Sequence, residues 1–306
     1  TLIAIADPNV PPNTAFVPEG TTARAPFNDL SPQVTLAYQA TNDVNFYAKY
    51  AKGFKSGGFN GEAGSPAETI RPYEAEKIDS FEAGMKSRFW DNRAQFNVSA
   101  FVNKHKDMQL SIFTAERAAG SNVRNAGQAT IKGLEFEGLL QASETLLLRA
   151  NMGLLEKEYN EFLEFDAGLG ELVDVADDRA FPHAPGMTFA AGFDWDVLSG
   201  DFGDVTLTGD VNHSSEYHTF PFALSASSPQ PASNTLAPSR TVFDARLAWS
   251  NLPVAGQGVE IAVWAKNLTD EEYLTNFIDF GPDFGGITNG YFGPPRTYGV
   301  TLGVDF

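Results

Sequence analysis

The amino-acid sequence predicts an all-β protein, an antiparallel transmembrane β-barrel, and three observations lead to this prediction. Runs of residues alternate between apolar and polar with a period of two, which places one set on each face of a β-strand. About eleven such runs follow one another, and most are longer than the ~5–6 residues usual in soluble sheets. Their connections alternate between short and long, as in barrels with short periplasmic turns and long extracellular loops.

The last run, residues 296–306, shows the alternation most clearly. Its apolar residues share one face and end in an aromatic residue at the C-terminus; they are Tyr298, Val300, Leu302, Val304 and Phe306. In water this exposed apolar strand would be prone to aggregation. In a bilayer its apolar face would meet lipid, with aromatic residues at the interface. Taken alone, the run also suits the last strand of a soluble sandwich. The repetition of the pattern along the chain favours the barrel.

Composition excludes several classes of protein. The net charge of −18 and a pI near 4.5 argue against nucleic acid as a partner, because its phosphates need Lys and Arg. No apolar run reaches the ~18 residues of a transmembrane helix. The mean hydropathy of −0.21 is typical of a soluble protein. A barrel gives the same value, because polar lumen residues offset the apolar residues that face lipid.

The predicted strands follow an irregular start. Residues 1–30 contain five prolines and little periodicity, which is typical of a loop. The alternating runs are expected at residues 33–40, 44–50, 74–90, 92–112, 123–141, 145–162, 189–195, 205–211, 243–249, 258–268 and 296–306. Asp91-Asn92 is suited to a tight turn. The long connections are residues 51–73, 114–122, 160–185, 214–239 and 269–295.

The two faces of these strands are expected to meet different environments. The residues expected to face lipid are Phe81, Leu134, Phe193, Phe243 and Leu302. Those expected to face the lumen are Glu82, Glu135, Asp194, Asp244 and Thr301. The loop pattern predicts that the C-terminus and the short turns are periplasmic, and that Thr1 and the long loops are extracellular.

An odd number of antiparallel strands cannot close a barrel, because the first and last strands would be parallel. An open edge in hydrocarbon would leave backbone groups unsatisfied. We therefore expect this chain to be the C-terminal half of a longer barrel. Residues 1–30 would be the remainder of an extracellular loop, and residues 31–306 would be barrel wall.

Six stretches resemble the TonB-dependent outer-membrane receptors of Gram-negative bacteria. The strongest is residues 45–60, NFYAKYAKGFKSGGFN. The other five are residues 82–87 (EAGMKS) with the turn at 91–93, residues 133–138 (GLEFEG), 243–246 (FDAR), 266–273 (KNLTDEEY) and 294–299 (PPRTYG) with the final Phe306. The resemblance covers nearly everything from about Leu30 onward.

The resemblance implies a barrel of 22 strands around an N-terminal plug. It implies import of a ferric siderophore, haem, cobalamin or an oligosaccharide, driven through the TonB–ExbB–ExbD complex, and no cofactor. The plug and the segment that engages TonB would lie outside this chain. Outer-membrane lipid, lipopolysaccharide and the barrel-assembly machinery would be further partners. Tyr298 and Phe306 would form the assembly signal.

Loop residues are the candidates for substrate binding, because long ordered loops are often functional. They are Phe54, Lys55, Phe59, Tyr217, Phe220, Phe284, Tyr291 and Phe292. Aromatic rings offer contact area with little rotamer entropy to lose. The glycine-rich stretch around Phe54 and Phe59 has an alternative role as a structural bend. The negative charge of the chain favours a neutral or sugar-like ligand over a strongly anionic one.

Charged residues on the predicted lumen face have two interpretations. They are Glu82, Lys86, Glu135, Glu137, Arg149, Asp244 and Arg246. They could bind the plug, or they could form a ladder of cross-strand ion pairs that lines a wet interior. His213 and His218 with Glu216 fall short of the four ligands of a structural zinc site.

No catalytic motif stands out, and the sequence does not predict an enzyme. G-x-S-x-G, H-E-x-x-H and G-x-x-x-x-G-K are all absent from the sequence. A passive porin is the main alternative to a receptor. An assembly barrel and an outer-membrane hydrolase stay open as well.

Overall fold

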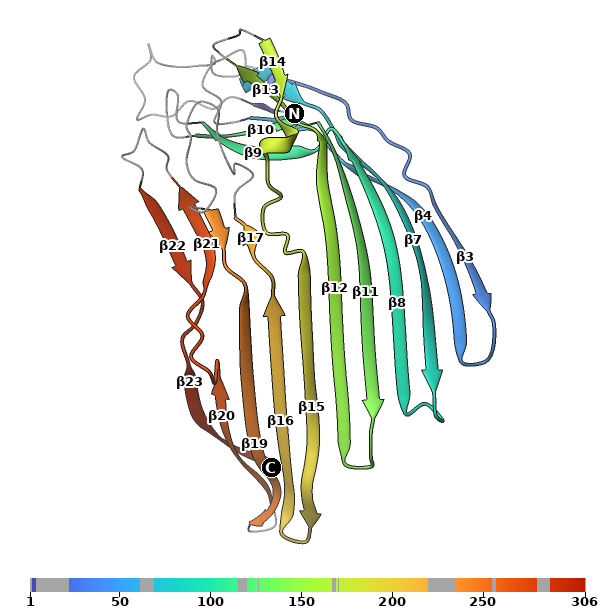
Figure 1. The fold of residues 1–306 in the computed structure, drawn as a ribbon, viewed down its shortest axis with the longest axis vertical. Coiled ribbons are helices and arrows are strands. Elements are labelled where there is room, and N and C mark those ends of the chain that lie inside the picture. The colour runs from blue at the N-terminus through green and yellow to red at the C-terminus, as the bar shows by residue number, and fades with distance from the viewer. Residues whose placement is uncertain are drawn as a thin grey trace.

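The computed structural model describes residues 2–3, 22–60, 69–114, 120–125, 127–166, 169, 171–219, 235–254, 257–279 and 287–305. Within these residues, one antiparallel sheet contains eleven strands, and each strand pairs with its neighbours in that order along the chain (Figure 1). The strands are β3 (Gln33–Gln39), β4 (Val44–Lys55), β7 (Glu76–Phe89), β8 (Ala94–Lys106), β11 (Gln128–Gln141), β12 (Leu146–Glu161), β15 (Met187–Gly200), β16 (Gly203–Ser214), β19 (Arg240–Val254), β20 (Gln257–Lys266) and β23 (Thr297–Asp305). The predicted all-β fold with about eleven strands is confirmed.

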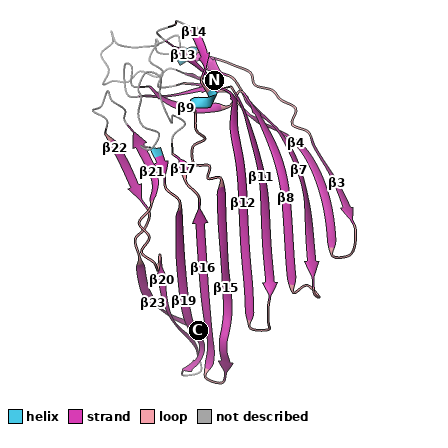
Figure 2. Ribbon diagram, viewed as in Figure 1, coloured by secondary structure: helices cyan, strands magenta, loops and turns pink. Residues whose placement is uncertain are grey.

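The connections divide between the two ends of the sheet. Figure 1 shows tight hairpins and the C-terminal end of the chain at the bottom, and the longer connections at the top. Six two-stranded ribbons form in the described residues outside the large sheet: β1 (Leu2–Ile3) with β2 (Thr22–Ala23), β5 (Gly58–Phe59) with β6 (Pro72–Tyr73), β9 (Gln109–Thr114) with β10 (Gly120–Asn125), β13 (Leu163–Asp166) with β14 (Glu171–Asp174), β17 (Tyr217–His218) with β18 (Leu236–Ala237), and β21 (Leu274–Asp279) with β22 (Thr288–Phe292). A short 3-10 helix, η2 (Ala176–Asp178), follows β14. Figure 2 shows how little helix accompanies the strands.

Two predicted runs are each divided in two, which corrects the sequence-based boundaries. Residues 92–112 form β8 and β9, because Asp107 adopts a left-handed conformation with φ of 54° between them. Residues 123–141 divide between β10 and β11 at Gly127, where φ is 105° and a Cβ would lie 2.3 Å from the carbonyl oxygen of Glu161. Only glycine fits such a position without strain. The β9–β10 ribbon therefore leaves the large sheet as a separate hairpin.

The predicted turn at Asp91-Asn92 is present. Trp90, Asp91 and Asn92 have positive φ values of 52°, 54° and 67°. Three consecutive left-handed residues reverse the chain within the short connection between β7 and β8.

The large sheet has one apolar face and one polar face. Residues directly opposite each other in an antiparallel pair share a face. Leu134 lies opposite Ala100 and Leu154. Phe243 lies opposite Val211. Followed from strand to strand, the pairing places the five residues predicted for lipid on the apolar face, and the five predicted for the lumen on the polar face.

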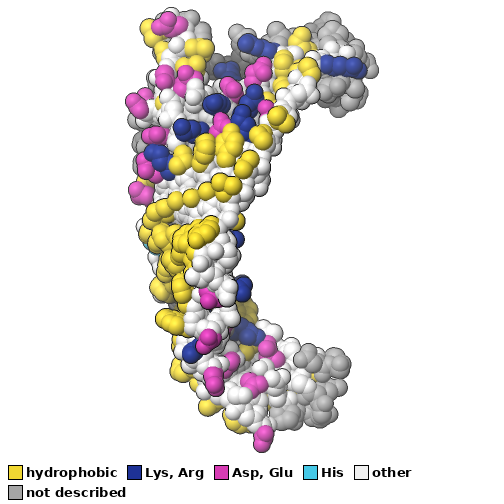
Figure 3. Space-filling view, turned by 90° about the vertical axis from the view of Figure 1, so that its right-hand side faces the viewer, with side chains coloured by type: hydrophobic (Ala, Val, Ile, Leu, Met, Phe, Trp, Pro, Cys, Tyr) yellow, Lys and Arg dark blue, Asp and Glu magenta, His cyan; other side chains and the backbone are white. Residues whose placement is uncertain are grey.

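The apolar side chains gather at mid-height on the sheet. Figure 3 looks at the molecule from the side of β3 and β4, and it shows a hydrophobic band with charged side chains above and below it. Large apolar residues within this face are strongly exposed, for example Leu36 at 71% and Val300 at 72%. Among the residues that the structure describes, no helix is long and apolar enough to cross a membrane.

A small core lies at the end of the sheet that carries the long connections. Tyr159, at the end of β12, stacks on Phe181 with ring centroids 4.1 Å apart. Phe162 meets Tyr159 edge-on at 5.2 Å and is only 1% exposed. The connection after β12 is thereby packed against the top of the polar face.

Candidate functional site

Arginine side chains link neighbouring strands across the polar face. Arg149 on β12 forms ion pairs with Asp194 on β15 and with Asp210 on β16; its Nη2 lies 2.7 Å from Asp210 Oδ1. Arg246 Nη2 lies 2.5 Å from Glu260 Oε1. These pairs hold the strands in register, and their side chains remain 33–40% exposed.

Hydrogen bonds continue the same ladder on β4, β7, β8 and β11. The Tyr47 hydroxyl donates to Glu82 Oε1 at 2.6 Å. Lys86 lies over the Tyr47 ring with its Nζ 5.9 Å from the centroid. Ser99 donates to Glu135 at 3.3 Å.

The seven charged residues predicted for the lumen thus have cross-strand or local partners on the polar face. Glu137 accepts a hydrogen bond from Asn97 at 3.1 Å. Asp244 accepts one from the backbone N–H of Asn267 at 2.8 Å. Within the ranges that the structure describes, only Arg149 and Arg246 form the cross-strand ion pairs of the ladder interpretation, whereas the other five have hydrogen-bond partners or, for Lys86, an aromatic ring. Contact of these residues with a plug stays a prediction.

A polar pocket of about 380 Å³ lies where the long connections meet the top of the polar face. Three segments build it: the end of β12, the connection around η2, and the β17–β18 ribbon. Its lining residues are Lys157, Glu158, Tyr159, Ala176, Asp177, Arg179, Ala180, Phe181, Ala184, Glu216, Tyr217, His218 and Leu236. Cationic, acidic and aromatic groups therefore converge on one concave surface.

Local hydrogen bonds fix the η2 side of the pocket. The Asp174 carboxylate accepts the backbone N–H groups of Phe162 at 2.9 Å and of Ala176 at 3.1 Å. The Arg179 guanidinium lies 5.5 Å from the Phe162 ring centroid. The ammonium of Lys157 donates to the Ala184 carbonyl. Strand β12 and the η2 connection are thus held to each other.

Tyr217 supports the opposite side of the pocket. It is 9% exposed, and its hydroxyl donates to the Thr275 carbonyl at 2.9 Å. Arg240 donates to the same hydroxyl at 3.3 Å and also lies 5.2 Å from the Tyr273 ring centroid. The Tyr217 hydroxyl therefore ties β17 to β21, while the residue itself lines the pocket.

His218 is a titratable group in the lining of the pocket. Burial lowers its pKa below the ordinary 6.5; Glu216 opposes this shift and Lys157 adds to it. Its Nδ1 lies 3.3 Å from Thr235 Oγ1, and its carbonyl accepts from the backbone N–H of His183 at 2.7 Å. The neutral imidazole is therefore favoured over the charged form at pH 7.

Acidification is expected to loosen the β17–β18 ribbon. Because the folded pKa of His218 is below the unfolded value, the unfolded segment binds more protons between the two, so stability falls as pH drops below about 6.5. Hydrogen–deuterium exchange of residues 215–219, corrected for intrinsic rates, should be faster at about pH 5.5 than at about pH 7.5. His218→Gln should remove the difference, and His213→Gln should retain it. Equal protection at both pH values in the unmodified protein would contradict the prediction.

The residues predicted to contact substrate are distributed over several ribbons. Tyr291 and Phe292 lie on β22 and are 48% and 62% exposed. Phe59 on β5 pairs with Pro72. Lys55 lies 4.0 Å from Glu76, and Phe54 belongs to the apolar face, opposite Lys77. The predicted Phe220, Phe284 and Phe306 lie outside the described residues.

The two histidines considered for metal binding have separate hydrogen-bond partners. His213 lies 2.8 Å from the Thr241 hydroxyl on β19, whereas His218 contacts Thr235. Within the described part of the chain, no group of three or more His, Cys, Asp or Glu side chains could hold a metal ion.

The sequence did not single out Lys157, Arg179, Phe181 or Arg240. Alternation along β12 places Lys157 on the polar face, two residues before Tyr159. The sequence pattern could therefore have identified Lys157 as a residue of this face. Arg179 and Phe181 come from a connection and Arg240 begins β19, and the packing of all three depends on contacts that no local pattern encodes.

Comparison with known proteins identifies the family. The sequence model described as TonB dependent receptor-like, beta-barrel matches residues 7–268. The chain belongs to this family. The match confirms the family resemblance, and it covers the stretches at residues 45–60, 82–87, 91–93, 133–138 and 243–246.

Solved TonB-dependent receptors share the fold of this chain. The ferric yersiniabactin uptake receptor FyuA from Yersinia pestis superposes with a TM-score of 0.68 at 20% identity, over 90% of this chain and 37% of FyuA. The siderophore receptor PiuA from Acinetobacter baumannii gives 0.63 at 19% identity, over 89% of this chain and 35% of PiuA.

Among curated proteins, the metal-pseudopaline receptor CntO of Pseudomonas aeruginosa is 27% identical over 128 residues, which are 42% of this chain and 17% of CntO. The pesticin receptor of Yersinia enterocolitica is 32% identical over 107 residues, which are 34% of this chain and 15% of that receptor. The matched segments thus cover less than a fifth of the length of these relatives.

Proposed function

We propose that this chain forms part of the wall of an outer-membrane transporter that imports a scarce nutrient, with energy supplied through the TonB–ExbB–ExbD complex. The observation that carries the proposal is the division of one eleven-stranded meander into an apolar face and a polar face, in a chain of this receptor family. An apolar face of this kind suits lipid, and a polar face suits a wet lumen. The long connections would then be extracellular and the short turns periplasmic.

The polar face is proposed to line the lumen and to contact a plug domain. Arg149, Glu82 and Arg246 on this face have ion-pair or hydrogen-bond partners on neighbouring strands, and these contacts stabilise the sheet against water. The same groups are half-exposed and can accept or donate further hydrogen bonds to a plug.

The proposed substrate class is a metal ion carried by an organic chelator. FyuA is a ferric yersiniabactin receptor and CntO a metal-pseudopaline receptor, and both resemble this chain. Aromatic area and cations are available near the mouth of the wall: Tyr291 and Phe292 are exposed on β22, whose partner β21 is tied to Tyr217, and Lys157 lines the pocket. A neutral or sugar-like ligand, which the net charge favours, is the alternative.

Uptake by cells that carry the full-length receptor distinguishes active import from a porin. Radioactive iron supplied as a ferric siderophore should accumulate only while the proton-motive force is intact, and a protonophore should abolish accumulation. The same assay with a labelled oligosaccharide tests the sugar alternative. Uptake that continues at an unchanged rate after protonophore treatment would indicate passive diffusion and contradict the proposal.

Truncation of the exposed loop aromatics should weaken substrate binding. Tyr291→Ala and Phe292→Ala are each expected to raise the Kd of the imported complex roughly fivefold, about 1 kcal/mol, as for typical interface residues. Trp90→Ala is the matched control, because Trp90 is an exposed aromatic residue (70%) in a short turn at the other end of the sheet. Equal effects at both ends would contradict the assignment of binding to the long loops.

A further inference from the structure

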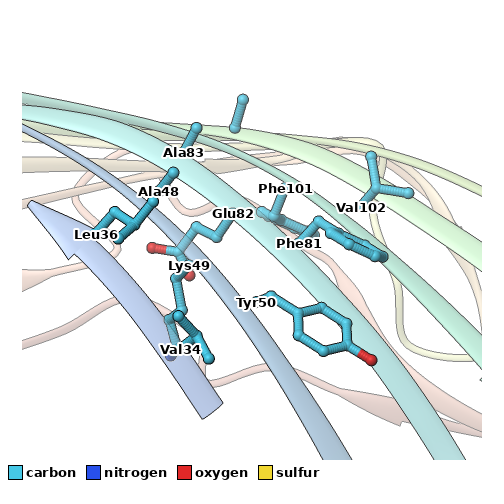
Figure 4. Close-up of a pocket in the computed structure, with 11 residues that line it drawn as sticks. Val34, Leu36, Ala48, Lys49, Tyr50, Phe81, Glu82, Ala83, Phe101 and Val102 are labelled. Carbon is cyan, nitrogen blue, oxygen red and sulfur yellow. The ribbon is translucent and has the colours of Figure 1, made fainter.

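An apolar groove of about 450 Å³ runs over β3, β4, β7 and β8. Eight of its eleven lining residues belong to the apolar face. Figure 4 shows Tyr50, Phe81 and Val102 as one row, and Leu36, Ala48 and Ala83 as the next. The Tyr50 and Phe81 rings lie 4.9 Å apart between centroids and form a raised wall beside the smaller alanine side chains. A groove with this lining fits a hydrocarbon chain.

Lysine side chains lie directly above this groove on the same face. Lys52 and Lys104 lie opposite Asp79, one on each side, in the row next to Tyr50, Phe81 and Val102. In the following row, Lys77 lies directly opposite Lys106. Figure 3 shows Lys and Arg side chains, with Asp and Glu side chains among them, immediately above the hydrophobic band. We call Lys52, Lys77, Lys104 and Lys106 the lysine patch.

The lysine patch has too few carboxylates to neutralise it. Asp79 is its single opposed carboxylate; it accepts a hydrogen bond from the Tyr50 hydroxyl at 2.8 Å and lies 3.8 Å from Lys106. Among the described residues, Lys52, Lys77 and Lys104 form no ion pair. Like charges directly opposite each other on a sheet are destabilising, so the Lys77–Lys106 pair points to an anion bound between them. This excess of positive charge occurs in a chain with a net charge of −18.

We propose that the lysine patch and the groove form a binding site for lipopolysaccharide, with phosphate groups on the lysines and an acyl chain in the groove. The site has the required order along the membrane normal, with cations at the level of the headgroups and apolar wall beneath them. Anionic headgroups contribute roughly 1 kcal/mol per Lys near the surface. The inference rests on the proposed extracellular position of the long connections, because lipopolysaccharide occupies the outer leaflet.

The test is lipid binding by the full-length receptor in nanodiscs made of a zwitterionic phospholipid. Bis-phosphorylated lipid A is titrated and counted by native mass spectrometry, with dephosphorylated lipid A and phosphatidylglycerol as comparison probes. The double variant K77Q/K106Q should bind phosphorylated lipid A roughly thirtyfold more weakly, as expected for the loss of two lysine contacts. R88Q/K266Q is the matched control, because it removes two exposed cations outside the lysine patch and should bind as the unmodified receptor does. Ala83→Phe, which fills the groove with an apolar side chain, should weaken lipid A in both phosphorylation states.

Each outcome decides a separate point. Unchanged lipid A affinity in K77Q/K106Q, or equal affinity of the unmodified receptor for phosphatidylglycerol, would overturn the site. The orientation is checked independently by labelling Asp177→Cys in intact cells with a membrane-impermeant maleimide. Labelling together with an unchanged lipid A affinity would reject the site and leave the proposed function standing. Failure to label would place the long connections in the periplasm and overturn the orientation and the lipopolysaccharide site together.

Discussion

Residues 1–306, expressed without any additional strands, are expected to form no heat-modifiable, protease-resistant barrel in outer membranes. In the described residues, β3 and β23 are the two ends of the large sheet, and each pairs on one side. Both edge strands expose a wholly apolar row, with Leu36 71% and Tyr298 80% exposed. The unpaired N–H and C=O groups of these strands would lie in hydrocarbon, where each unsatisfied group costs several kcal/mol. Eleven strands cannot remove this cost by closing as an all-antiparallel barrel, because β3 and β23 run in the same direction.

Semi-native electrophoresis with and without heating, followed by trypsin treatment of the membranes, measures the outcome. The full-length receptor, expressed from the same promoter, provides the matched control and should show both a heat-dependent shift and resistance. A resistant, heat-modifiable monomer formed by residues 1–306 alone would contradict the prediction. Pairing of β3 with β23 from a second copy would give a heat-sensitive dimer, and this would also show that the open edges drive association.

The large sheet was predictable because its pattern is local. Period-two alternation in stretches such as 96–102 assigns each side chain to a face without knowledge of its partner strand. Short turns with Asn and Asp, as at Asp91-Asn92, set the hairpins, and their left-handed φ values match the turn chemistry. A consistent register around eleven strands then follows from burying one face in lipid.

The pocket was not predictable, because it depends on contacts between residues distant in sequence. Tyr159 and Phe181 stack although they belong to a strand and to the connection that follows it. Tyr217 reaches Thr275, 58 residues away, through a single hydrogen bond. No periodicity marks such pairs. Tyr217 was singled out for its aromatic ring alone, and its largely buried position could not be read from the sequence.

The division of two predicted runs has a similar cause. Asp107 and Gly127 interrupt regions that remain extended and partly alternating on both sides, so pattern counting joins them. The Asn125 side chain donates to the Asp107 carbonyl at 2.8 Å and thereby links the two interruption points. This bond spans 18 residues, and it defines where the β9–β10 ribbon leaves the wall.

An arginine in the middle of the apolar face is expected to destabilise the full-length receptor strongly. Leu134 lies between Ala100 and Leu154 at the centre of the face and is 40% exposed. Leu134→Arg should lower the free energy of unfolding in lipid vesicles by roughly 2–4 kcal/mol, because the guanidinium would lie near the bilayer midplane. Urea titration of the receptor refolded into vesicles, followed by tryptophan fluorescence, gives this quantity.

The opposite face supplies the control that makes the experiment decisive. Ser99 lies on the neighbouring strand β8, one residue from Ala100, but on the polar face, where it donates to Glu135 at 3.3 Å. Ser99→Arg should change the free energy of unfolding by less than about 1 kcal/mol, because the cation would meet water and the Glu135 carboxylate. The depth is nearly the same for both substitutions, so the difference isolates the environment of the two faces. Equal costs would show that both faces are wet or both are dry, and a larger cost for Ser99→Arg would mean that the polar face is the one against lipid.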